Sequence, residues 1–89
     1  DLTTVQSLIV ETCDEIKNLL LEKNRKYGNS ALEPSRIFAK SSPVEQIKVR
    51  LDDKLTRIKN QAGDEDEDVV QDLMGYLVLL RVAQKLNAI

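Results

Sequence analysis

Apolar residues recur every three or four positions along most of the chain, which is the spacing of amphipathic α-helices. The first such stretch covers about 22 residues, and its core-facing positions are Val5, Leu8, Ile9, Thr12, Ile16, Leu19 and Leu20. Thr3 or Thr4 can cap its start. The segment Tyr27-Gly28-Asn29 marks its end, because Gly and Asn tolerate a positive φ. The pattern therefore predicts one long helix at the start of the chain.

A second helix has the clearest start signal in the sequence. Ser42 is a typical N-cap residue, Pro43 suits the first helical position, and Glu45 at the third position completes a capping box. Its apolar stripe consists of Val44, Ile47, Leu51, Leu55 and Ile58. Gly63 is the predicted stop. Between the first two helices, the sequence supports at most a short helical turn around residues 35–39.

The last part of the chain is apolar on almost every side. An acidic run at residues 64–68 precedes it, and negative charge favours the N-terminus of a helix. A helix from about Asp66 to Leu86 would carry Val69, Val70, Leu73, Met74, Leu77, Val78, Leu79, Leu80 and Val82. Such a helix is central or lies in a subunit interface. We expect a single all-α domain over residues 1–89, with three long helices and a short helical turn forming an antiparallel bundle that oligomerisation completes.

The length and composition of the chain limit the ligands, metals and cellular compartments that suit it. A chain of 89 residues buries a small share of its surface, so a partner subunit would stabilise it. Its lone Cys13 excludes an internal disulfide, and without His any metal would be bound by oxygen, which favours Mg²⁺ or Mn²⁺. The net charge of −2 argues against binding duplex nucleic acid, and no apolar run is long enough to span a membrane. We therefore expect a soluble, cytoplasmic protein.

Carboxylates form a row beside the apolar face of the first helix. The row follows steps of four, three and four residues and contains Glu11, Glu15, Asn18 and Glu22. Three carboxylates in one row repel each other, which a bound cation would relieve. The alternative is a solvated face, with Glu22 neutralised by nearby basic residues.

The last helix carries a comparable row. Asp72 lies one turn after Asp68, inside an otherwise apolar run, where a carboxylate is costly to bury without a cation or hydrogen-bond donors. The alternatives are an ion pair between Asp72 and a cation of the middle helix, and a simple helix-start role for Asp68. Gly75, a poor helix former, suggests close approach by a ligand or by another helix.

The middle helix supplies the opposite charge. Arg50, Lys54 and Arg57 lie on one flank of its apolar stripe, although Arg50 and Arg57 could equally form a surface ladder with Asp53. Carboxylates from two helices can hold Mg²⁺, and the cations can hold the phosphates that Mg²⁺ commonly accompanies.

Three segments carry a family resemblance: residues 23–30 (KNRKYGNS), 47–58 (IKVRLDDKLTRI) and 68–76 (DVVQDLMGY). Together they resemble the phage and bacterial nucleotide-modification-associated domain, which is itself similar to the all-α, MazG-like nucleoside triphosphate pyrophosphohydrolases. The resemblance covers nearly the whole chain in element order. It implies carboxylate-bound Mg²⁺, cleavage of a nucleoside triphosphate into a monophosphate and pyrophosphate, and assembly as homo-oligomers, either dimers or tetramers.

The resemblance also implies roles for individual residues. Glu11 and Glu15 would match the metal-binding acids of the first helix. Asp68 and Asp72 would match those of the second, and Glu15 and Asp72 would be catalytic. The residues expected to contact the nucleotide are Lys23, Lys26, Tyr27, Arg50, Lys54 and Arg57. The acids of each pair are four residues apart here, whereas the hydrolases typically space them three apart.

Three functions remain open from the sequence. The first is a Mg²⁺-dependent nucleotide pyrophosphohydrolase. The second is a non-hydrolysing protein that binds or sequesters a nucleotide, such as a phage anti-defence protein, and the third is a helical interaction module. Base stacking would use one of the three aromatic residues, Tyr27, Phe38 and Tyr76, or an Arg plane. We expect Tyr27, beside Gly28, to stack on the base, and packing within the loop is its alternative.

Overall fold

The computed structural model describes residues 2–29, 32, 42–60 and 68–87. These contain three α-helices and no strand: α1 (Leu2–Tyr27), α2 (Pro43–Lys59) and α3 (Val69–Asn87). The all-α prediction is confirmed. The helical turn predicted at residues 35–39 and the stop predicted at Gly63 lie outside the described residues. No helix in the described part combines the length and apolar character needed to cross a membrane.

The end of α1 and the start of α2 lie where their local signals predict, but α1 begins at Leu2, before the predicted caps Thr3 and Thr4. At the end of α1, Gly28 has φ 66° and its N–H donates to the Asn24 carbonyl at 2.7 Å, which is how a left-handed glycine ends a helix. At the start of α2, the Ser42 hydroxyl accepts from the Glu45 N–H at 3.1 Å. Short-range capping therefore decides both positions.

The end of α2 and the start of α3 also differ from the prediction. α2 ends at Lys59, and Asn60 forms its C-cap with an N–H donated to the Thr56 carbonyl at 3.0 Å. α3 begins at Val69, not near Asp66, because the Asp68 carboxylate caps it by accepting from the Gln71 N–H at 2.9 Å. The helix-start alternative for Asp68 is thus what the structure supports.

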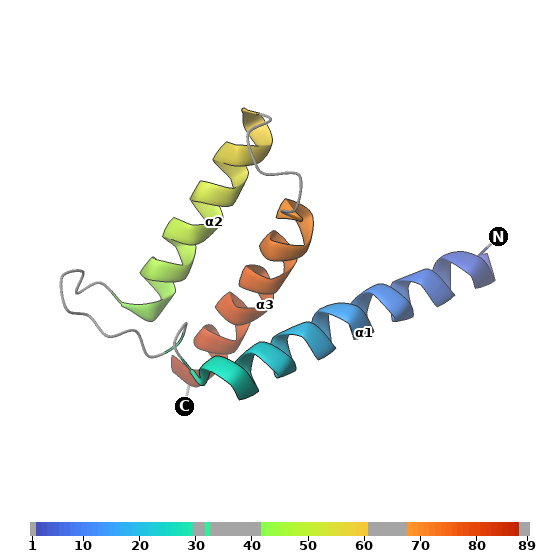
Figure 1. The fold of residues 1–89 in the computed structure, drawn as a ribbon, viewed down its shortest axis with the longest axis horizontal. Coiled ribbons are helices and arrows are strands. Elements are labelled where there is room, and N and C mark those ends of the chain that lie inside the picture. Colours follow the sequence, from blue (N-terminus) through green and yellow to red (C-terminus); the bar gives the residue numbers. More distant parts are fainter. Residues whose placement is uncertain (1, 30–31, 33–41, 61–67, 88–89) are drawn as a thin grey trace.

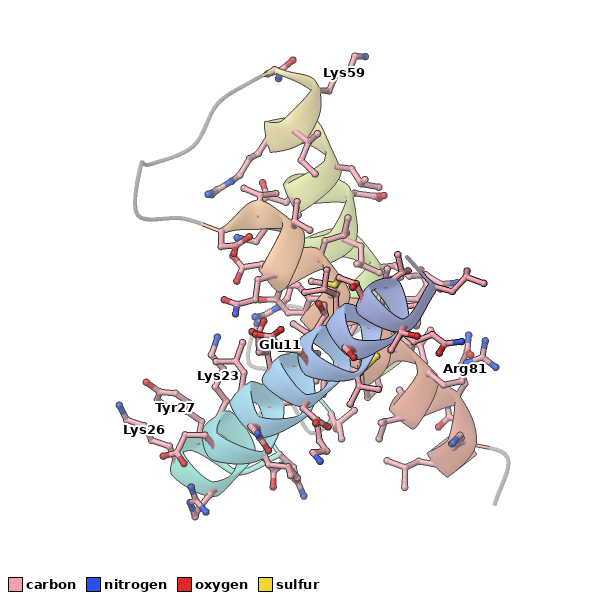
Figure 2. All side chains as sticks on the ribbon, turned by 90° about the vertical axis from the view of Figure 1, so that its right-hand side faces the viewer. Glu11, Lys23, Lys26, Tyr27, Lys59 and Arg81 are labelled. Carbon is pink, nitrogen blue, oxygen red and sulfur yellow. The ribbon has the colours of Figure 1, made fainter. Side chains whose placement is uncertain are left out.

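The three helices form an antiparallel hairpin with one crossing helix. α2 and α3 run in opposite directions side by side, and α1 crosses α3 so that its N-terminal half extends away from the hairpin (Figure 1). Figure 2 shows this crossing of α1 over α3 from the side. The core lies between α2 and α3 and contains Ile47, Leu51 and Ala83. α3 is therefore the central helix, as its apolar composition predicts.

The predicted apolar stripes are only partly buried. In α2, Leu55 and Ile58 remain exposed, because the core contacts α2 mainly through its first half. In α1, the sole buried residue is Ile16, while Val5 and Ile9 are exposed. The stripe of α1 extends past α3 because the two helices cross instead of lying along each other (Figure 2).

Gly75 lies where α1 and α3 approach each other. It is buried, and a Cβ added there would be 3.4 Å from Leu20 Cδ2, an ordinary contact with the end of a flexible side chain. The expected close approach by another helix is thus present. Gly75→Ala should raise the free energy of unfolding by about 0.5–1 kcal/mol, because Ala loses less backbone entropy in a helix. Urea denaturation measures this, and a clear loss of stability would show that the crossing tolerates no methyl group.

Candidate functional site

A cavity of about 180 Å³ lies between the C-terminal part of α1 and the first half of α3. Its apolar lining comes from Leu19, Leu20, Leu32, Gly75 and Leu79. Its polar lining comes from Lys23, Asn24, Tyr27, Gly28, Asn29, Arg50, Gln71, Asp72 and Tyr76. Four of the residues singled out as candidate site residues, Lys23, Tyr27, Arg50 and Asp72, therefore come together from three helices.

The helical repeat places Lys23 and Tyr27 on this cavity. Ile16, Leu20, Lys23 and Tyr27 follow steps of four, three and four and so share one face of α1. The face is apolar where α1 crosses α3 and becomes polar beyond the crossing. Figure 2 shows Lys23, Lys26 and Tyr27 projecting to the same side of α1, with the Lys26 ammonium 5.2 Å from the centre of the Tyr27 ring.

Arg50 reaches the cavity from α2 and is held by an aromatic residue. One of its Nη atoms donates to the Tyr76 hydroxyl at 3.3 Å, and its guanidinium lies 5.8 Å from the centre of the Tyr76 ring. Neither Arg50 nor Lys23 forms an ion pair with any residue that the structure describes. The cavity therefore carries two positive charges that are not neutralised by described carboxylates.

Asp72 forms an ion pair with Lys54, whereas the sequence predicted that it binds a metal ion. Its Oδ2 lies 3.2 Å from the Lys54 ammonium, and the two side chains are 27% and 15% exposed. This pair joins α3 to α2 in a partly desolvated setting, where a lone carboxylate would be costly. The structure thus contains the ion pair with a cation of the middle helix that was the alternative prediction for Asp72. Lys54 lies outside the cavity lining and neutralises Asp72 instead of facing the proposed phosphates.

The other predicted metal ligands do not join Asp72. Asp68 caps α3, and Glu11 and Glu15 lie exposed on α1 (Glu11 is labelled in Figure 2). Among the described residues, no three carboxylate or thiol side chains lie close enough together to hold a metal ion. The described donors are thus not gathered as a Mg²⁺ or Mn²⁺ site would need.

The basic residues on the flank of α2, Arg50, Lys54 and Arg57, also have different partners. Arg57 Nε lies 3.3 Å from Asp53 Oδ2, four residues earlier on the same helix. This is one half of the surface ladder that the sequence left open, because Arg50 lines the cavity and bonds Tyr76 instead of joining Asp53. Lys26 contributes beside the cavity through its contact with Tyr27 and does not line it.

Several polar residues of the cavity were not among the candidates. They are Asn24, Asn29 and Gln71. The Asn24 amide donates to the Asn29 side-chain oxygen at 2.7 Å, which orders the turn at the rim. Tyr76, which the sequence left open as a stacking residue, also lines the cavity and lies one helical turn after Asp72.

No protein-family model matches the chain, and no curated protein and no solved structure matches it. The resemblance to the nucleotide-modification-associated domain therefore stays a prediction.

Proposed function

We propose that this chain binds a nucleotide in the cavity between α1 and α3. The observation that carries the proposal is the pairing of two cations, Lys23 and Arg50, with two tyrosines, Tyr27 and Tyr76, around one cavity. The cations come from different helices and have no described carboxylate partner. A phosphate is the common biological anion that would be held by both an ammonium and a guanidinium.

The remaining lining suits the other parts of a nucleotide. A base can stack on Tyr27, which is 62% exposed, and the polar edge of the base can bond the side-chain amides of Asn24 and Gln71. Pockets for whole drug-sized ligands measure about 300–1,000 Å³. A cavity of about 180 Å³ would hold part of the nucleotide and leave the rest at its mouth.

The charge distribution favours binding over hydrolysis. A Mg²⁺-dependent pyrophosphohydrolase needs carboxylates gathered around its metal, and the described residues of one chain contain no such group. Asp72, the acid among the residues lining the cavity, is paired with Lys54. The protein we propose therefore binds or sequesters a nucleotide, in the cytoplasm of a bacterium or of a phage-infected cell as the family resemblance would imply.

Nucleotide-dependent thermal stabilisation tests the proposal. A ligand at 100 times its dissociation constant stabilises the folded state by about 2.7 kcal/mol, so a screen of nucleoside mono-, di- and triphosphates should identify at least one that raises Tm. Lys23→Ala should then weaken binding by about tenfold or more in calorimetric titrations, because a charge-assisted hydrogen bond contributes about 1.5–3 kcal/mol.

Lys59→Ala is the matched control. Lys59 lies at the far end of α2 from the cavity (Figure 2), so its loss should leave affinity unchanged. The proposal fails if no nucleotide raises Tm, or if the two variants bind equally well. Release of pyrophosphate or phosphate, measured on the same samples, would instead assign a hydrolase.

A further inference from the structure

The apolar stripe of α1 is longer than the part of it that α3 covers. Its members follow alternating steps of three and four residues and are Leu2, Val5, Ile9, Thr12, Ile16 and Leu19. This spacing is typical of a helix that packs along another helix. Ile16 is 7% exposed against α3, whereas Ile9 is 57% and Leu2 79% exposed. The first half of the stripe therefore lies uncovered on the part of α1 that extends away from the hairpin (Figure 1).

An apolar groove joins the uncovered stripe to α3. It has a volume of about 300 Å³, and its lining residues are Thr12, Cys13 and Ile16 of α1 and Met74, Leu77 and Val78 of α3. Leu77 is 50% exposed and Val78 43% exposed, so the wall that α3 contributes is open as well. The groove and the nucleotide cavity have no lining residue in common. This surface is therefore separate from the proposed nucleotide site.

The shape of the surface fits a helix. Residues 2–16 of α1 extend over about 21 Å, at 1.5 Å per residue. A small molecule that filled the groove would leave Leu2 and Val5 exposed, whereas a helix of about four turns would contact the whole stripe. Binding of an amphipathic helix through its apolar face is a common way in which proteins cover such a groove.

The charges beside the uncovered stripe are acidic. Residues 2–16 contain three carboxylates and no basic residue. Asp14 is paired with Lys17, with its Oδ1 3.3 Å from the Lys17 Nζ. Glu11 and Glu15 are exposed, lie one helical turn apart, and form no ion pair with any residue that the structure describes. A partner with two cations at the same spacing would neutralise them.

This charge limits the kinds of partner that fit. Glu11 and Glu15 would repel the phosphates of a nucleic acid or of an anionic membrane. A second copy of the chain would bring its own residues 2–16, which carry the same carboxylates and no cation. Figure 2 shows Arg81 of α3 on the opposite side of α1 from Glu11, so α3 supplies no cation at the acidic edge of the stripe.

We propose that this surface binds a basic amphipathic helix of another protein. The apolar side of that helix lies along the stripe of α1 and enters the groove between α1 and α3. Its Lys or Arg residues, four positions apart, pair with Glu11 and Glu15. The apolar contacts with Ile9 and Leu77 supply most of the affinity, and the charge pairs select a basic partner over an acidic one.

Two synthetic peptides test the charge of the partner. Each is a helix-forming chain of about 18 residues, with Leu at alternating steps of three and four, and one has Lys beside the Leu row where the other has Glu. In fluorescence anisotropy at low salt, the Lys peptide should bind the wild-type chain about tenfold more tightly than the Glu peptide. Added salt should reduce this difference, and replacing both Glu11 and Glu15 with Gln should abolish it.

Two adjacent variants test where the peptide binds. Ile9 and Val10 are similarly exposed, at 57% and 60%, but successive helical residues point about 100° apart. Ile9→Gln should weaken binding of the Lys peptide by about tenfold or more, because an amide replaces an apolar contact. Val10→Gln, outside the stripe, should bind as the wild type does. Neither side chain is buried, so both variants should fold.

The same samples show whether the surface has a different occupant. The proposal is overturned if neither peptide binds, if the two peptides bind equally well, or if the two variants have equal affinities. It is also overturned if light scattering shows a wild-type dimer that Ile9→Gln makes monomeric, because the chain itself would then cover the stripe. Selective binding of the Lys peptide, lost in Ile9→Gln and retained in Val10→Gln, supports it.

Discussion

Replacing Ile47 with Ala should lower the free energy of unfolding by about 2–5 kcal/mol, the cost of emptying a well-packed core position. Ile47 is 1% exposed and lies at the centre of the packing between α2 and α3. A domain of 89 residues has a total stability of about 4–13 kcal/mol. The substitution should therefore remove a large part of the stability, which urea denaturation followed by far-ultraviolet circular dichroism measures.

Val49→Ala is the control on the same helix. Val49 is 66% exposed, so its truncation should change stability by no more than about 0.5 kcal/mol. Ala also has the higher helix propensity, which offsets any lost contact. Equal losses in the two variants would contradict the packing of α2 on α3 through Ile47.

Replacing Asp72 with Asn should destabilise the fold by about 1–3 kcal/mol. Asp72 and Lys54 are both largely covered, and Asn would leave the Lys54 ammonium without its carboxylate. Breaking a fully buried pair costs about 3–5 kcal/mol, and partial exposure to water lowers that figure. Denaturation of Asp72→Asn, of Lys54→Met and of the double variant forms a thermodynamic cycle that isolates the interaction.

The cycle also separates the ion pair from a metal site. If the pair is present, the double variant should be more stable than the sum of the single losses predicts, because neither charge is left alone. If Asp72 instead shared a Mg²⁺ ion with Glu15, neutralising it would leave the metal-free protein unchanged or more stable. That result, together with the loss of Mg²⁺-dependent stabilisation, would contradict the ion pair and restore the metal interpretation.

The sequence predicted the features that neighbouring residues decide. The end of α1 at Gly28 and the start of α2 at Ser42 follow from hydrogen bonds between residues three or four positions apart. The three helices follow from apolar periodicity, and the central place of α3 from its apolar composition. Such short-range effects need no knowledge of the rest of the fold.

The tertiary structure decided which charges meet. Asp72 could have bound a metal ion or any of three cations of the middle helix, and the register of α2 against α3 brings it to Lys54. Arg50 bonds Tyr76 across 26 positions of sequence, a partner that no local spacing indicates.

The crossing of α1 over α3 likewise decided which part of one continuous stripe is covered. Leu2 and Ile16 are equivalent in the helical repeat, yet one is exposed and the other buried. The spacing of apolar residues shows which face of a helix is apolar, because the helical repeat alone determines which residues share a face. Where another helix covers that face depends on packing between segments far apart in the chain.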